Sequence, residues 1–337
     1  MTTYHAPQRD MRFVLHELLG VEELAELPGY EDASRDVLDQ VIEEGARFCE
    51  NVLFPLNRIG DEAGCVYENG VVRTPAGFKE AYDAFTAGGW TGLAAGAEYG
   101  GQGLPKTVKF VVDEMVCSAN MAFANYPGLS AGAYLAIETH ASDALKARYL
   151  PKLAEGRWSG TMCLTEPQCG TDLGLIRTRA EPDGDGGYRI SGTKIFITSG
   201  EHDLSQNIVH LVLARLPDAP KGIRGISLFL VPKLLPKEDG EAGPRNGVSC
   251  AGIEHKMGIK ASATCVMSFE GARGWLLGEP HRGMRAMFTM MNDARLEVGL
   301  QGLAVAETAY QSAVAYARER LQGRALQGAR EPERPAD

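Results

Sequence analysis

The cysteine, histidine and apolar patterns that mark several protein classes are missing from this sequence. Its seven cysteines are scattered and include no C-x-x-C pair, which supports neither a zinc site nor a disulfide framework. The seven histidines form no H-x-x-x-H or H-E-x-x-H pair, so we predict no metal site. Residues 1–20 do not resemble a signal peptide, and no apolar run reaches membrane length. We therefore expect a cytoplasmic protein that is not embedded in a membrane.

Phosphate-binding loops are also missing. Neither G-x-G-x-x-G nor G-x-x-x-x-G-K-[ST] occurs, and in the nearest match, 187–194, Thr193 stands where the lysine would be. The formal net charge of -10 argues against a broad phosphate-binding surface. A nicotinamide or ATP fold therefore has no support, and nucleic acid is not expected as a partner.

The sequence does contain enough apolar residues for a sizeable core, 44% of 337. In the first part of the chain they recur at helical spacing. The helical runs are 33–59, 76–92 and 105–155, and we expect Pro127 and Pro151 to mark breaks. Residues 1–158 are predicted to form an N-terminal helical domain.

The pattern changes near residue 159. Short alternating or β-branched runs bounded by Gly, Pro and Asp follow, at 160–166, 187–198, 207–215, 225–232 and 263–269. They predict a central β domain over 159–280, either a small barrel or a sandwich. The predicted fold class is therefore α+β.

A third region, 281–337, begins with a long helix. No proline interrupts 282–324, and an apolar stripe runs from Met284 to Val314. The polar stretch 328–337 is too short to cover this stripe. We expect either another chain to cover it or a C-terminal helical bundle that is truncated here.

Two segments of the β domain carry side chains suited to a redox-active ring. In 162–172 a strand runs into a turn that bears the hydroxyls of Thr165 and Thr171. On a later strand, Phe196 and Thr198 are two residues apart and so share one face. A flavin that accepts hydride becomes anionic, so such donors stabilise its reduced state. Taken singly, each segment also fits an ordinary strand and turn.

One G-x-S-x-G sequence, the pattern of a nucleophile elbow, surrounds Ser130. No buried strand precedes it, and no strand-helix alternation follows. A packing role for these small residues is the better prediction, and a serine hydrolase is the weakest functional alternative.

Together these segments resemble the acyl-CoA dehydrogenase family. Its [YF]-C-x-T-E-P-x-x-G-S-D motif is matched by 162–172 and its K-x-[WYF]-I-[ST]-x-[AG] strand by 194–200. Two further segments, 255–262 and 317–323, resemble its K-x-G-x-[RK]-x-S and Y-x-x-x-R-x-x-F-G motifs. The resemblance spans nearly the whole chain and implies an N-terminal helical domain, a central β-barrel and the start of a C-terminal bundle.

The resemblance also implies a reaction. Relatives use FAD to dehydrogenate an acyl-CoA thioester at its α and β carbons, and they pass the electrons to an electron-transfer flavoprotein. The long helical start and Leu173–Ile176 are similar to the larger bacterial members. These include the 3-methylmercaptopropionyl-CoA dehydrogenases of dimethylsulfoniopropionate breakdown, so that thioester or a short-chain acyl-CoA is the expected substrate. A homo-oligomer, dimer or tetramer, is expected as well.

Site residues follow from the same resemblance. The implied cofactor-binding residues are Met162, Leu164, Thr165, Gly170, Thr171, Phe196, Thr198, Arg320 and Gln322. Within this set, Thr171 would hold the phosphates, and Phe196 with Thr198 would flank the ring. Met162 stands where the family has an aromatic residue.

The remaining assignments fall on the last helix. Arg295 matches the family's arginine near coenzyme A. Arg320 and Gln322 match a segment that reaches the flavin of a neighbouring subunit, although here it lacks the phenylalanine and is one residue short.

No residue of the chain is assigned as the catalytic base. Most relatives use a glutamate in their last helices, and a minority place it at the position of Ala294, which has no proton-accepting group. Glu297, three residues on, is the only local substitute, and a plain surface or helix-contact role is its alternative. We expect the base beyond Asp337. A second functional hypothesis is a flavin- and CoA-binding module without turnover.

Overall fold

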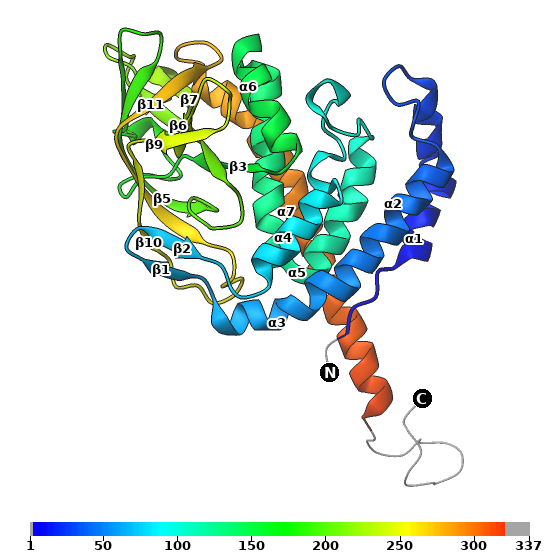
Figure 1. The fold of residues 1–337 in the computed structure, drawn as a ribbon. Helices are drawn as coiled ribbons and strands as arrows, with labels where there is room; N and C mark the ends of the chain where they lie inside the picture. Colours follow the sequence, from blue (N-terminus) through cyan, green and yellow to red (C-terminus); the bar gives the residue numbers. More distant parts are fainter. Residues whose placement is uncertain (1–2, 321–337) are drawn as a thin grey trace, which may run out of the picture.

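The computed structural model describes residues 3–320, and its first part is helical (Figure 1). The helices are α1 (Gln8–Arg12), α2 (Arg35–Phe48), α3 (Phe54–Ala63), α4 (Phe78–Ala87), α5 (Lys106–His140) and α6 (Asp143–Ala154). Short 3-10 or π-helical turns lie at Phe13–Leu18, Val21–Glu26, Cys49–Leu53, Trp90–Gly92 and Ala97–Tyr99. In α2 the apolar positions Leu38, Ile42 and Ala46 are buried, as their helical spacing predicts.

The chain changes direction inside α5 at Asn120. The backbone there is extended (φ -158°, ψ 87°). The Asn120 Oδ1 accepts a hydrogen bond from the Phe123 N–H at 3.0 Å, which is helix N-cap geometry, and its Nδ2 donates to Leu53 O at 3.2 Å. Pro127 and Pro151 lie inside helices. The breaks predicted at these prolines are wrong, because the cap that starts a new helix is supplied by Asn120.

A β-hairpin interrupts the helical region. Its strands are β1 (Val66–Glu68) and β2 (Val71–Arg73), and Asn69 and Gly70 form the turn with positive φ values of 50° and 81°. The Tyr67 hydroxyl donates to a backbone carbonyl of the barrel at 3.1 Å, so the hairpin docks there. The mainly helical prediction for this region missed the hairpin, although an Asn-Gly pair is a recognised hairpin signal.

The central domain is a closed barrel. Its strands are β3 (Trp158–Cys163), β4 (Arg179–Pro182), β5 (Tyr188–Thr198), β6 (Asn207–Arg215), β7 (Ile226–Pro232), β10 (Val248–Ile253) and β11 (Thr264–Leu277). Hydrogen-bonded neighbours close a ring in the order β11, β5, β4, β6, β7 and back to β11. Strand β3 extends from β6 and β10 from β11, while β8 (Leu234–Pro236) and β9 (Ala242–Arg245) form a separate hairpin. The predicted barrel is confirmed.

The long helix α7 (Gly283–Glu319) packs against α5 and β7, and its C-terminal part extends beyond the other helices (Figure 1). Buried residues concentrate near its start, at Ala286, Met287 and Met290. Apolar side chains farther along are more than half exposed, namely Leu296, Val298, Leu303, Val305, Tyr310 and Tyr316. Within residues 3–320, the apolar stripe is therefore covered at its start and largely uncovered from Leu296 onwards. No helix between Thr3 and Arg320 is both long and apolar enough to cross a bilayer.

Candidate functional site

The two segments predicted to hold a flavin lie side by side in the barrel. The Ile195 N–H donates to Thr165 O at 2.9 Å. The Lys194 ammonium donates to Leu164 O, also at 2.9 Å. The chain just after β3 and the end of β5 therefore form one continuous surface, which we call the β3–β5 wall: residues 162–171 and 194–198.

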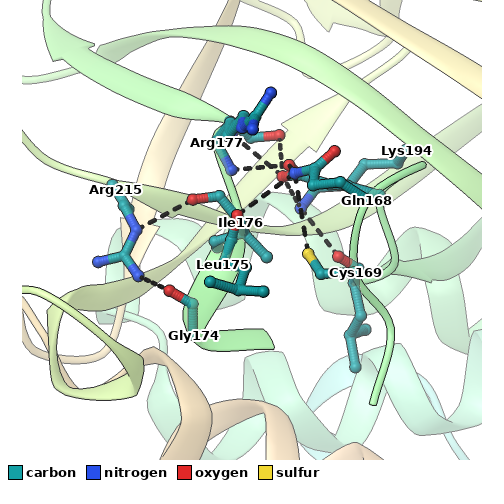
Figure 2. A network of polar contacts seen from close by, with 11 residues as sticks. Gln168, Cys169, Gly174, Leu175, Ile176, Arg177, Lys194 and Arg215 are labelled. Carbon is teal, nitrogen blue, oxygen red and sulfur yellow. Dashed lines mark hydrogen bonds and ion pairs between the residues drawn. The ribbon is translucent and has the colours of Figure 1, made fainter. Parts of the chain in front are cut away.

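A buried ion pair holds this wall together (Figure 2). The Glu166 and Lys194 side chains are 3% and 0% exposed, and Oε1 lies 2.8 Å from Nζ. Glu166 also accepts hydrogen bonds from the Thr178 hydroxyl at 2.6 Å and from the Arg177 N–H at 2.7 Å. Burial by itself raises the pKa of Glu166, but Lys194 and these donors outweigh it and lower the pKa to about 2. The carboxylate stays ionised and fixes three segments of the barrel.

Arg215 holds the turn that follows the first motif. Its guanidinium donates to Gly174 O at 2.7 Å and to Ile176 O at 3.1 Å (Figure 2). The predicted site residues do not include Arg215, Glu166 or Lys194. Glu166 and Lys194 occupy defined positions of the two sequence motifs, so the sequence did contain a signal that could have identified them. No sequence motif points to Arg215, because its role depends on a turn that is distant in the sequence.

Phe196 combines a strained backbone with an exposed ring. Its φ is +59°, at a β-bulge where the pairing of β5 with β11 shifts register. The residue is 58% exposed, whereas the neighbouring Ile197 is 2% exposed. Such a conformation costs on the order of 1–3 kcal/mol and tends to occur at ligand sites. A flat ligand stacked on the ring would account for both the exposure and the retained strain.

The other predicted wall residues differ in how far they are buried. Thr165 and Thr198 are half-buried and Thr171 is exposed. Gly170 packs beside Thr165, where an added Cβ would come within 3.2 Å of its methyl group. Met162 and Leu164 are half-buried against the core shared by the helices and the barrel. The wall thus carries an aromatic ring, hydroxyl groups and apolar side chains, a combination that fits a flavin.

The residues predicted on α7 make few contacts with the rest of the protein. Arg295 is exposed, hydrogen-bonds Asn292 at 2.9 Å and lies 5.1 Å from the centre of the Phe288 ring. Arg320 is exposed at the C-terminal end of the helix. Gln322 lies outside the described residues.

Glu297 is half-buried at the contact between α7 and α5. Its Oε1 lies 3.3 Å from the Lys109 ammonium. Burial raises the pKa of Glu297 to about 7, with further upward effects from Asp113 and Asp293 and an opposing effect from Lys109. A pKa near neutrality suits a general base, but this carboxylate faces a cation on α5.

Ser130 is not placed as a nucleophile. It lies in the middle of α5 and is 5% exposed. Its hydroxyl donates to Tyr126 O at 2.8 Å and accepts from the Gly160 N–H at 3.1 Å. The serine joins α5 to β3, so the hydrolase alternative lacks the strand-turn-helix context that it requires.

Comparisons with known proteins give consistent descriptions. The family model "Acyl-CoA dehydrogenase, N-terminal domain" matches residues 38–157, and "Acyl-CoA dehydrogenase, middle domain" matches 161–272. A 3-methylmercaptopropionyl-CoA dehydrogenase from Ruegeria pomeroyi is 52% identical over 97% of this chain and 55% of that protein. The chain spans about half the length of the curated relatives it matches.

Solved structures are similar to this fold as well. Butyryl-CoA dehydrogenase from Megasphaera elsdenii aligns with a TM-score of 0.71 and 28% identity, over 85% of this chain and 70% of that one. An acyl-CoA dehydrogenase from Bacillus anthracis, complexed with FAD, aligns with a TM-score of 0.71 and 26% identity, over 86% of this chain and 45% of that one.

Proposed function

The chain belongs to the acyl-CoA dehydrogenase family, and from this premise we propose that it forms the flavin- and thioester-binding part of an enzyme that oxidises a short acyl-CoA. The observation that carries the proposal is the β3–β5 wall. The segments around Thr165 and Phe196, selected separately in the sequence, are joined there by hydrogen bonds and a buried ion pair. This rigid surface suits a flat ring that must keep its orientation during hydride transfer.

FAD is the cofactor that these residues fit, and when bound it supplies the acceptor for the hydride that leaves the β carbon. Met162 contributes apolar contact and Phe196 a ring face. Thr165 and Thr198 offer O–H donors to the part of the ring that gains negative charge. Thr171, exposed at the turn, offers a donor to the phosphates.

The relatives support the proposed substrate class. The 52% identity to a 3-methylmercaptopropionyl-CoA dehydrogenase supports a short thioether or straight acyl chain. Arg295, exposed on α7, is assigned to the phosphates of coenzyme A.

A carboxylate must remove the α proton of the thioester. At the helix position where some relatives carry this base, the described residues include no carboxylate that is free of an ion pair. Ala294 has no acidic group, and Glu297 is paired with Lys109. We therefore assign no residue of the described chain, 3–320, as the base. The pairing of Glu297 also favours a second candidate function, in which this chain binds flavin and thioester without turning over.

Electron transfer and assembly complete the proposal. Electrons leave to an electron-transfer flavoprotein in the cytoplasm, and the chain works as a homo-oligomer in which Arg320 reaches a neighbour's flavin. The family resemblance supports both statements. The exposed apolar side chains of α7 support the oligomer.

The first test is an absorbance scan of the FAD-incubated, purified chain across the flavin bands, before and after adding 3-methylmercaptopropionyl-CoA. We expect flavin bands that persist, which would indicate binding without a base in this chain. Bleaching would instead show that a competent base is present and would make Glu297 a candidate for it. If no bands remain after free FAD is removed, the assignment of the wall to a flavin is wrong.

A further inference from the structure

The end of β5 is held in a strained conformation. Phe196 and Ser199 have φ values of +59° and +56°, in the left-handed region that residues with a side chain rarely adopt. Thr198, which the proposed function assigns to the flavin, lies between them. Such conformations persist only where the surrounding structure fixes them. The contacts that fix residues 196–200 therefore also fix two of the predicted flavin-binding side chains.

Two fully buried side chains hold the backbone of this segment. The Thr161 hydroxyl donates to Thr198 O at 2.5 Å, and the His210 Nε2 donates to Gly200 O at 2.9 Å. Both donor residues are 0% exposed. Thr161 of β3 and His210 of β6 are paired in register, so their side chains project to the same face of the sheet. This single register pair therefore holds two carbonyl oxygens that are two residues apart at the end of β5.

The His210 ring is a neutral donor with a fixed direction. Burial lowers the pKa of His210 to about 4, although the Gly200 and Val231 carbonyls oppose this effect. A neutral imidazole carries one N–H, and the shorter contact, to Gly200 O, assigns it to Nε2. Nδ1 lies farther from its neighbour, 3.2 Å from Val231 O. The edge of the ring packs against Phe269 of β11, with 5.8 Å between ring centres, which keeps the donor aimed at β5.

A second chain of hydrogen bonds starts from β3 but does not reach residues 196–200. The His202 Nδ1 accepts from the Leu204 N–H at 3.2 Å, so its Nε2 donates to Ser159 Oγ at 3.0 Å. Ser159 then donates to Ser205 Oγ at 2.9 Å, because the Ser205 hydroxyl itself donates to Asn207 O at 2.8 Å. These bonds fix the loop between β5 and β6. They provide an internal control for the bonds made by Thr161 and His210.

We propose that Thr161 and His210 are positioning residues for the flavin: by holding the carbonyls of Thr198 and Gly200, they set the direction of the Thr198 hydroxyl and of the Phe196 ring. This inference rests on the proposed flavin-binding function. Both side chains are fully buried, so they act through the backbone of β5 and not by touching the cofactor. Loss of either donor lets the strained segment relax, which turns the ring and the hydroxyl away from the flavin.

The experiment compares matched variants of the FAD-loaded chain. Thr161→Val and His210→Phe keep a side chain of similar shape and remove the donor, whereas Thr161→Ser and His210→Gln retain one. Circular dichroism in the flavin bands reports the orientation of the bound ring, and a flavin titration gives the affinity. For the two donor-free variants we expect altered flavin dichroism at saturating FAD and an affinity about fivefold weaker, the value of one lost hydrogen bond. The two donor-retaining variants should resemble the wild type.

Ser205→Ala is the control, because it removes a hydrogen bond from the second chain and leaves the Thr198 and Gly200 carbonyls paired. It should lower the melting temperature without changing the dichroism or the affinity of the flavin. If Ser205→Ala alters the flavin dichroism as much as Thr161→Val does, the effect is a general loosening of the barrel and the positioning role is refuted.

Three other outcomes can be told apart. If folded Thr161→Val and His210→Phe bind FAD with wild-type affinity and dichroism, the positioning role is refuted and the proposed function stands. If His210→Phe does not fold, as judged by far-ultraviolet circular dichroism, the comparison of Thr161→Val with Thr161→Ser decides alone. If the wild-type chain binds no FAD, the proposed function is wrong, and the positioning of a flavin fails with it.

Discussion

Glu166 is the residue on which the geometry of the β3–β5 wall depends most. It bonds Lys194 of β5, Thr178 and Arg177 before β4, and Gln168 in its own turn. Removing one member of a buried ion pair leaves the other charge uncompensated, which costs about 3–5 kcal/mol. The pair is therefore better understood as a device that orients the wall than as a net source of stability.

The first prediction concerns this ion pair. Glu166→Gln should lower the free energy of unfolding by about 3 kcal/mol and weaken FAD retention, because Lys194 loses its anion. Thr178→Val is the milder variant, since it removes one hydrogen bond and leaves the pair intact, at a cost of about 1–3 kcal/mol. Urea denaturation and FAD content after gel filtration measure both effects. Full FAD retention by a folded Glu166→Gln protein would contradict a positioning role.

The same carboxylate predicts an acid-dependent loss of stability. Its pKa in the folded state is lowered from 4.5 to about 2, so its contribution is complete above the unfolded value and is lost as pH falls towards about 2. Between about pH 4.5 and pH 2, the stability of the wild type should therefore fall more steeply than that of Glu166→Gln. Parallel slopes in thermal melts over this range would rule the contribution out.

At Phe196, stability and ligand binding should respond in opposite directions. Phe196→Gly removes the left-handed strain and should raise the free energy of unfolding by up to about 1 kcal/mol, while the loss of the ring weakens FAD binding by up to about tenfold. Asp218→Gly is the matched control, because Asp218 is exposed with φ +58°. It should change stability in the same direction and leave FAD affinity unaltered, which thermal melts and flavin titrations would show.

At the scale of elements, the break in α5 depends on one amide side chain. Asn120→Ala removes the cap on the Phe123 N–H and leaves the buried Leu53 carbonyl without its donor. We expect a loss of about 1–3 kcal/mol in urea denaturation. Asn120→Ser, which retains a capping oxygen, should lose less. An equal loss in both variants would indicate that packing, and not capping, fixes the break.

The type of most elements could be predicted from periodicity, because a face that must be buried repeats within the element itself. This holds for α2, for α7 and for the barrel strands. Asn120 and the bulge at Phe196 could not be predicted in this way. The first depends on a contact with Leu53, and the second on pairing with β11, both distant in sequence. The candidate site residues could be named because they match motif positions. The Lys109–Glu297 contact could not be predicted, because it forms only when α5 packs against α7.

At the scale of the whole molecule, α7 leaves Leu296, Leu303 and Tyr310 more than half exposed, as expected of a surface that contacts another chain. We predict that the purified chain associates with itself as its concentration rises. The double variant Leu303→Lys with Tyr310→Lys should shift sedimentation towards the monomer, because it places charges among these side chains. The conservative double variant Leu303→Met with Tyr310→Phe should sediment like the wild type. Identical sedimentation of the lysine variant and the wild type would show that this face does not mediate association.

The barrel can close only after its last strand, β11, has been synthesised. Strand β5, which carries Phe196 and Thr198, has β11 as a neighbour, and β11 ends at Leu277. At a ribosomal rate of roughly 5–20 residues per second, on the order of ten seconds pass between the emergence of these two strands. During that interval β5 has an unpaired edge, and the bulge at Phe196 has no partner to define it. A nascent chain therefore acquires its cofactor late, and chaperones that shield strand edges would raise the yield of the flavin-loaded protein.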